Sequence, residues 1–151
     1  MVEIFEYESI YADDFKRLNL EWLDKYHLTE PADLAILDDP EKEILGTGGC
    51  LYLAWIDGEI AGSAALIGEG EGVFELAKMA VAPKFQGRGI SKLLIAKCLE
   101  QANILAAKRI YLLSNSQLTT AIKLYEKYGF IHVPVFHSHY ASADTMMELV
   151  L

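Results

Sequence analysis

The order of apolar patterns along the chain predicts an α/β fold built on a mixed sheet. Helical spacing of apolar residues in the first third gives way to two apolar runs joined by Asp57-Gly58, a pair preferred in tight hairpins because both positions need positive φ. Residues 73–113 then show a strand, a glycine turn, a helix and a second strand, the arrangement of a right-handed parallel crossover. The 151 residues contain no repeat, linker or low-complexity segment, so a single domain over 1–151 is expected.

The N-terminal third is expected to form a strand followed by helices. Residues 2–7 alternate between apolar and polar side chains, as a half-buried strand does. Apolar residues recur at helical spacing over 11–26, and a proline at the start of 31–37 is tolerated in the first turn of a second, shorter helix. Residues 41–45 add a turn before the glycine-rich stretch 46–49 breaks the chain.

The middle of the chain is expected to be a meander of three strands. Cys50–Ile56 and Glu59–Ile67 form the two arms of the hairpin. Val73–Val81 follows as the third strand, after a looser glycine-rich turn over 68–72. Pro83 ends this strand because proline has no N–H group to donate to a neighbour.

Helices alternate with strands in the C-terminal half. Ile90–Ala107 is the clearest helix in the chain, because its apolar residues form one stripe at i, i+4 spacing. Ile110–Leu113 is a short continuous apolar run, typical of a strand covered on both faces. Thr119–Tyr128 is expected to be a helix closed by a glycine, followed by two strands over Phe130–Phe136 and Thr145–Val150.

Charge and composition argue against several classes of function. A net charge of −9 lacks the excess of Lys and Arg on which nucleic-acid binding depends. No apolar run approaches the ~18 residues of a membrane-spanning helix, and the acidic, alternating start lacks the basic and apolar blocks of a signal peptide. A cytoplasmic location is therefore expected. Cys50 and Cys98 fit no metal or redox spacing and are expected to be buried thiols.

The stretch Gln86-Gly87-Arg88-Gly89-Ile90-Ser91 stands between a strand and the clearest helix, and it can bind an anion. A helix start leaves several N–H groups unpaired and carries about half a positive charge, and glycine lets a ligand approach the main chain. No Gly-Lys-Ser/Thr follows, as a P-loop requires, and the three glycines of the Rossmann fingerprint are absent. On these residues alone, a phosphate cradle and a plain structural turn both remain open.

The surrounding sequence resembles the acyl-CoA motif of the GNAT superfamily of N-acetyltransferases. The run MAVAPKFQGRGISKLL carries the family's Gln/Arg-x-x-Gly-x-Gly/Ala core at Gln86 and Gly89, after a strand that ends in Val81-Ala82-Pro83. Ser91 departs from the usual Gly or Ala, but serine is small and its hydroxyl can contact a phosphate. A downstream block is similar to the family's second motif, with one residue more than the commonest spacing between its Asn and its Ala. It comprises Asn115, Ala121, Leu124-Tyr125-Glu126-Lys127 and Gly129-Phe130.

The resemblance implies a GNAT-like acyl-CoA N-acyltransferase fold. This is a central mixed, mostly antiparallel sheet with a V-shaped splay between the fourth and fifth strands, flanked by about four helices. Acetyl-CoA is the implied cosubstrate, with its pantetheine paired to backbone groups of 79–81 like an added strand and its pyrophosphate on the amides of 86–91. The implied cofactor-binding residues are Met79, Ala80, Val81, Gln86, Gly87, Arg88, Gly89, Ile90, Ser91, Lys92 and Asn115.

Two side chains are implied to carry the chemistry, which needs a base for the amine, donors for the oxyanion and an acid for the thiolate. Tyr125 matches the family's acid, since a phenol of pKa ~10 is protonated at neutral pH; a packing tyrosine is the alternative. Glu75 stands where the histone-acetylating branch places its base, acting directly or through a water chain, although a solvent-facing glutamate gives the same pattern. The amides of Ala80 and Val81 are the expected oxyanion donors. Lys78 either pairs with a neighbour or is a charge on the sheet face.

The acceptor site in the family is shaped by the first two helices and the last hairpin. Here those helices are rich in acidic and aromatic residues, which favours a cationic amine such as a polyamine, an amino sugar, a lysine side chain or a peptide N-terminus. A solvated helix face has the same composition. The residues are Glu21, Trp22, Asp24, Tyr26, Glu30, Asp33, Asp38 and Asp39.

Histidines near the C-terminus raise the question of a metal. If the segment is a strand, His137 and His139 share one face of it, and His132 precedes them. No acidic or cysteine ligand is spaced to complete a site, so no metal is expected. With Tyr140, these histidines are expected to border the acceptor pocket or to lie in a surface loop.

These inferences predict an N-acetyltransferase that moves an acetyl group from acetyl-CoA to a primary amine by direct attack in a ternary complex. The acceptor is a small cationic amine or a peptide or protein amine. A catalytically silent CoA-binding sensor is the alternative from another class, and an acetyltransferase with an open groove for protein amines is a third. Many relatives form dimers, so a homodimer is a family-level expectation.

Overall fold

The computed structural model describes residues 1–135, 138 and 140–151. The strands and helices follow in the order predicted, with short 3-10 turns at Ser9–Tyr11, Leu45–Thr47 and Pro83–Phe85. The elements are β1 (Glu3–Glu6), α1 (Ala12–Lys25), α2 (Pro31–Asp38), α3 (Pro40–Glu43), β2 (Cys50–Ile56), β3 (Glu59–Gly70), β4 (Val73–Val81), α4 (Ile90–Ile104), β5 (Arg109–Ser114), α5 (Thr119–Lys127), β6 (Ile131–Val133) and β7 (Thr145–Val150). No helix within these ranges is both long and apolar enough to cross a membrane.

The strands form one sheet in the order β1-β2-β3-β4-β5-β7-β6. Neighbouring strands in the described part of the chain are antiparallel except β4 and β5, which the α4 crossover makes parallel. The predicted mixed α/β fold is therefore confirmed. The turn expected over 41–45 forms as α3, which Pro40 opens and which Asp39 caps by accepting a hydrogen bond from the Lys42 amide.

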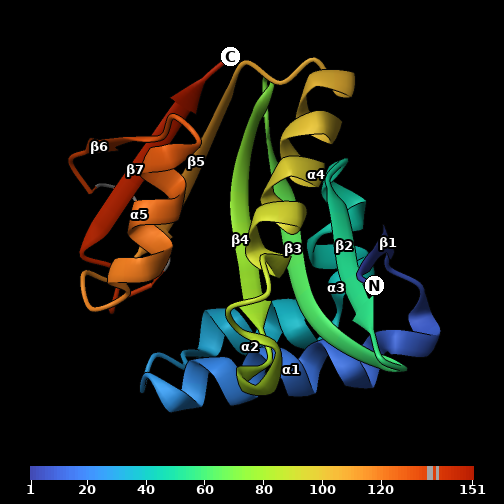
Figure 1. Cartoon of the computed structure of the whole chain (residues 1–151). Helices are drawn as coiled ribbons and strands as arrows, with labels where there is room; N and C mark the ends of the chain where they lie inside the picture. Colours follow the sequence, from blue (N-terminus) through green and yellow to red (C-terminus); the bar gives the residue numbers. More distant parts are fainter. Residues whose placement is uncertain (136–137, 139) are drawn as a thin grey trace.

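The sheet opens between β4 and β5, and this confirms the predicted splay. The two strands pair only where Val73–Glu75 faces Arg109–Tyr111. Beyond these residues β4 runs on to Val81 and β5 to Ser114 while the two strands diverge (Figure 1). The edge of β4 that faces the opening is therefore available to a ligand that pairs like a strand.

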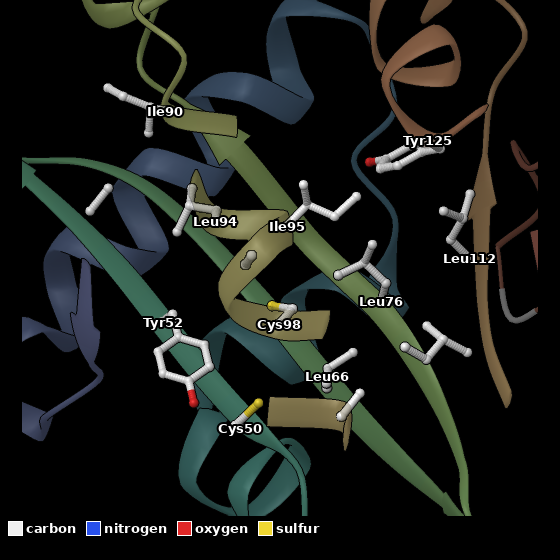
Figure 2. Close-up of a cluster of buried hydrophobic side chains, with 14 of the residues drawn as sticks. Cys50, Tyr52, Leu66, Leu76, Ile90, Leu94, Ile95, Cys98, Leu112 and Tyr125 are labelled. Carbon is white, nitrogen blue, oxygen red and sulfur yellow. The ribbon is translucent and has the colours of Figure 1, made fainter. Parts of the chain in front are cut away.

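Two apolar cores lie on opposite faces of the sheet. α4 covers one face, where Cys98 lies near Leu66 and Leu94 packs in the same core (Figure 2). α1 and α2 cover the other face with Phe15 and Leu37, both buried. Burial also raises the pKa of the Cys98 thiol, so it stays protonated and behaves as a small apolar side chain.

A β-bulge in β4 changes which side chains reach which core. Ser63 of β3 faces Ala80 and Ala65 faces Ala77, so Lys78 and Met79 share the partner position between them. Lys78 takes the left-handed conformation at φ 52°. In a regular strand, residues three positions apart point to opposite faces, yet Ala77 and Ala80 both pack in the core of α1 and α2. The bulge therefore resets the alternation of β4 beside the splay.

Three of the element ends that differ from the prediction show a local reason. The strand expected over Phe130–Phe136 ends at Val133, because Pro134 has no N–H group for the ladder; Phe136 lies outside the described residues. β3 extends to Gly70, so the turn that follows is tight, with positive φ at both Glu71 and Gly72. α4 ends at Ile104, before a left-handed Ala106 at φ 56°.

Candidate active site

Two neighbouring cavities lie in the opening between β4 and β5. The larger has a volume of about 500 Å³ and lies among the end of β4, the start of α4 and one side of α5. The smaller, of about 110 Å³, lies among β4, β5, α1 and the start of α2. Both are lined by Trp22, Met79, Leu118, Ala121 and Tyr125. This arrangement allows two ligands to meet at one point.

The glycine turn before α4 forms one wall of the larger cavity. Gly87 has φ 82° and Gly89, the N-cap of α4, has φ 76°, conformations that glycine adopts without strain. The Gln86 side-chain amide donates to the Val81 carbonyl at 3.3 Å, which ties the turn to the end of β4. The first N–H groups of α4 have no partners within the helix, so this wall is suited to an anion.

Nine of the eleven predicted cofactor-binding residues line the larger cavity, and two do not. Arg88 turns to Asp57, with Nη1 to Oδ2 at 3.5 Å, and its guanidinium lies 5.4 Å from the centre of the Phe85 ring. Asn115 lines the smaller cavity instead, where its side chain donates to the Ser142 carbonyl at 2.8 Å. The nine are Met79, Ala80, Val81, Gln86, Gly87, Gly89, Ile90, Ser91 and Lys92.

Tyr125 lies on α5 where the two cavities meet. Its ring is buried beside Phe130, with the ring centres 6.0 Å apart, and its hydroxyl points across the opening toward β4 (Figure 2). Burial raises the pKa of Tyr125 to about 12. The phenol is therefore protonated at neutral pH and able to donate a hydrogen bond into the junction.

Glu75 is a buried carboxylate on the wall of the smaller cavity, with 3% of its surface exposed. It is the last residue of β4 to face β5, where it lies opposite Tyr111. The charge of Glu75 contributes to the raised pKa values of two nearby tyrosines. Burial, a hydrogen bond to Glu69 and then the charge of Glu75 raise the pKa of Tyr111, while burial and then Glu75 raise that of Tyr140. The solvent-facing alternative for Glu75 does not match this burial.

A buried ion pair, Lys78 with Asp33, forms another part of the same wall. The Lys78 ammonium contacts Asp33 Oδ1, and the two side chains are 5% and 4% exposed. The second Asp33 oxygen accepts from the Glu30 amide at 2.9 Å in a capping box at the start of α2. The Tyr140 ring centre lies 5.3 Å from the ammonium. Lys78 is thus held in place from α2 and from the segment before β7.

Glu30 fastens that segment to α2. Its carboxylate accepts from the amides of Ala141 at 2.7 Å and Ser142 at 3.2 Å, and from the Ser142 hydroxyl. Although desolvation opposes ionisation, these hydrogen bonds lower the pKa of Glu30. The segment that carries Tyr140 is therefore anchored over the smaller cavity.

A chain of hydrogen bonds from Asn19 of α1 through Ser63 of β3 supports the bulge in β4. Ser63 Oγ donates to the Lys78 carbonyl at 2.7 Å and accepts from Asn19 Nδ2 at 3.0 Å, while Asn19 also donates to the Phe15 carbonyl at 3.0 Å. Ser63 is fully buried and Asn19 is 2% exposed. Because a left-handed lysine is strained, these hydrogen bonds maintain the local course of β4.

Most of the eight acidic and aromatic residues expected to attract a cationic amine lie outside the cavities. Trp22 and Asp33 line the smaller cavity, and Trp22 and Tyr26 line the larger. Glu21 is exposed on α1. The other carboxylates serve the fold: Asp24 accepts from Thr29, Glu30 binds Ala141 and Ser142, Asp33 pairs with Lys78, Asp38 pairs with Lys16, and Asp39 caps α3.

Of the three histidines near the C-terminus, the structure describes His132. His132 Nε2 lies 3.1 Å from Glu126 Oε2 on the exposed side of α5. His137 and His139 lie outside the described residues. Within the described ranges, no three His, Cys, Asp or Glu side chains are placed to hold a metal ion.

Sequence reasoning did not assign a role to Lys78, Ser63 or Asn19. Lys78 had one available signal, since it is a cation inside the otherwise apolar end of the strand VFELAKMAV. Ser63 and Asn19 had none, because a serine in an alanine-rich strand and an asparagine on an amphipathic helix are unremarkable until the two elements pack together.

Comparison with known proteins identifies the family. The family model for the acetyltransferase (GNAT) family matches residues 7–130. The uncharacterized N-acetyltransferase YjgM of Escherichia coli K12 is 36% identical over 116 residues, which cover 72% of this chain and 70% of that protein. The chain therefore belongs to the GNAT family of acetyltransferases, as its two motifs predicted.

Other relatives share only part of their length with this chain. The N-acetylaspartate synthetases of Xenopus tropicalis and Homo sapiens are 38% identical over 93 residues and 37% identical over 103 residues. The matches cover 61% and 68% of this chain but 34% of each synthetase. The chain thus spans about a third of the length of these relatives.

Solved structures agree on the fold. An acetyltransferase of the GNAT family from Staphylococcus aureus Mu50 has a TM-score of 0.91 with this chain, covers 99% of both chains and is 20% identical. The PaiA N-acetyltransferase from Thermoplasma acidophilum, solved in complex with coenzyme A, has a TM-score of 0.78, covers 100% of this chain and 99% of its own, and is 16% identical.

Proposed function

We propose that this N-acetyltransferase transfers the acetyl group of acetyl-CoA to a primary amine by direct attack in a ternary complex. The observation that supports the proposal is the meeting of two cavities at Tyr125 and Met79, one bordered by the anion-binding turn and the other by a buried carboxylate. The neighbour PaiA was solved with coenzyme A, which favours the same ligand for the larger cavity.

In this proposal the turn before α4 binds the pyrophosphate through its amides. Residues 86–91 supply these donors, and the pantetheine pairs with the open edge of β4 along 79–81. The thioester then lies beside Tyr125, at the junction of the cavities. Because Arg88 pairs with Asp57, its side chain contributes little to CoA affinity.

The chemistry follows from the groups at the junction. Glu75 accepts a proton from the amine, directly or through water, and the neutral nitrogen attacks the thioester carbonyl carbon. Successive amides of a strand point to opposite edges, and the Ala82 amide donates to Ala61 of β3, so the Val81 amide faces the opening and donates to the oxyanion that forms. As the C–N bond forms and the C–S bond breaks, Tyr125 donates a hydrogen bond to the departing thiolate. The nitrogen releases its second proton to solvent, the thiolate takes up one proton, and CoA leaves as the thiol. With a pKa near 12, the phenol serves mainly as a hydrogen-bond donor to the sulfur.

The acceptor is proposed to be a small molecule, because the cavity beside Glu75 is small. N-acetylaspartate, the compound named in several relatives, is the acetylated form of an amino acid, so amino acids belong in any acceptor panel. Amino acids, polyamines and amino sugars should be tested side by side with a peptide N-terminus.

One assay tests the proposal. The protein is incubated with acetyl-CoA and the amine panel, and free thiol is followed over time. We expect thiol release above background hydrolysis with at least one amine, and its loss in Tyr125→Phe while CoA binding persists. Tight CoA binding without turnover on any amine would instead support the sensor alternative.

A further inference from the structure

The wall of the smaller cavity carries one fixed cation. Lys78 is the only lysine, arginine or histidine among the described residues that line it. The same wall holds two carboxylates, Asp33 and Glu75, which are 3% exposed each. An acceptor that enters this cavity meets both signs of charge, at separate points.

The bulge is the reason that Lys78 and Glu75 share this cavity. They are three positions apart in β4, and a regular strand would direct them to opposite faces. The extra residue at the bulge resets the alternation, so Glu75, on the face of Ala77, and Lys78, in contact with α2, both line the space under α1 and α2. The Ser63 hydrogen bond to the Lys78 carbonyl maintains this geometry.

The ion pair leaves hydrogen-bond donors available on the lysine. Each Asp33 oxygen accepts one hydrogen bond, Oδ1 from Lys78 and Oδ2 from the Glu30 amide. An ammonium has three donors, and Asp33 is its one hydrogen-bond acceptor in the described part of the chain. A buried cation is costly unless its donors are satisfied, so Lys78 favours an additional oxygen ligand from the cavity.

The volume of the cavity matches a small acceptor. At 110 Å³ it holds on the order of ten water-sized groups, taking roughly 12 Å³ for each. A free amino acid has about this many heavy atoms. A second ammonium on a polyamine would meet the Lys78 charge at short range.

We infer that the acceptor is a small primary amine that also bears a carboxylate, and that Lys78 determines this specificity by binding the carboxylate. The inference rests on the proposed function. The amine end faces Glu75 and Tyr125, and the carboxylate end faces the Lys78–Asp33 pair. Such a molecule matches the charges of the wall, whereas a polyamine does not.

Matched acceptors test the inference. Aspartate, alanine, ethylamine and putrescine are compared both for turnover with acetyl-CoA and for binding to CoA-saturated protein by calorimetry. Alanine and ethylamine differ by the carboxylate alone. We expect kcat/KM and affinity at least tenfold higher for alanine or aspartate than for ethylamine or putrescine.

Variants assign the preference to Lys78. Lys78→Met alone would leave Asp33 buried without its partner, so the double variant Lys78→Met, Asp33→Asn removes both charges together. In this variant the preference for carboxylated acceptors should fall to about twofold, with CoA affinity within about threefold of the parent. Lys78→Arg, which keeps the charge, should retain a preference of at least fivefold.

The calorimetric binding measurements distinguish failure of this inference from failure of the proposed function. Carboxylate-dependent binding that disappears in the double variant supports the inference even if no amine is acetylated, in which case only the transferase proposal fails. Equal or better binding of ethylamine or putrescine, or binding of neither acceptor class, overturns it, as does a preference that survives the double variant.

Discussion

Gly89→Asp separates anion binding at the α4 turn from the folding of the turn. At φ 76° an L-residue is strained, but a Cβ added there meets no atom within 4 Å, so the expected loss of stability is about 1–2 kcal/mol from the left-handed backbone alone. The new carboxylate lies beside the proposed pyrophosphate site. Two unit charges about 5 Å apart repel by roughly 3 kcal/mol at an effective dielectric constant near 20, which raises Kd about 100-fold.

The assay is calorimetric titration with CoA at low ionic strength, alongside thermal unfolding. Gly89→Ala is the matched control, because it shares the backbone strain and lacks the charge. We expect Kd to rise by at least 100-fold in Gly89→Asp and by less than tenfold in Gly89→Ala, with similar losses of Tm. Added salt should narrow the gap, since it screens the repulsion. Equal Kd values in the two variants would refute the electrostatic reasoning, and unchanged CoA binding in Gly89→Asp would remove the cradle from this turn.

Three further substitutions probe the junction and its support. Tyr125→Phe should lower kcat about 100-fold without changing CoA affinity. Because burial raises the pKa of Tyr125 to about 12, the parent protein should also lose stability as the pH rises from about 10 to 12. If the variant has the same alkaline unfolding curve as the parent, the burial argument is wrong. Glu75→Gln should lower kcat at least 100-fold at neutral pH, with partial recovery as alkali deprotonates the amine in solution; a rate unaffected at pH 7 would exclude Glu75 as the base. Ser63→Ala leaves the part-buried Lys78 carbonyl without its donor and removes an acceptor from buried Asn19. Urea unfolding should therefore show a loss of about 1–3 kcal/mol, and a loss under ~0.5 kcal/mol would show that these hydrogen bonds do not support the bulge.

Local sequence patterns were sufficient to predict the helices, the strands and their order. The Asp57-Gly58 turn, the i, i+4 stripe of α4 and the strand ending in Val81-Ala82-Pro83 depend on local backbone geometry, which a sequence displays directly. The family motifs added the splay between β4 and β5, and the limited pairing of these strands confirms it. β6 ends at Val133, earlier than predicted, because Pro134 has no N–H group to donate to the next strand.

The placement of side chains around the cavities depended on contacts between distant segments. Asp33 and Lys78 are 45 positions apart, and Asn115 reaches Ser142 rather than the larger cavity. The alternation rule itself failed at Lys78, because the bulge depends on Ser63 from the facing strand.

The sequence by itself therefore determined the fold class and the family, and it predicts an anion-binding turn, since each depends on local periodicity and spacing. Only the tertiary structure decided that the acidic residues of α1 and α2 are mostly engaged in the fold and that a buried lysine lines the smaller cavity beside Glu75. The physical reason is that the charge of a cavity is set by which groups remain unneutralised after packing, and packing joins residues that no sequence spacing relates.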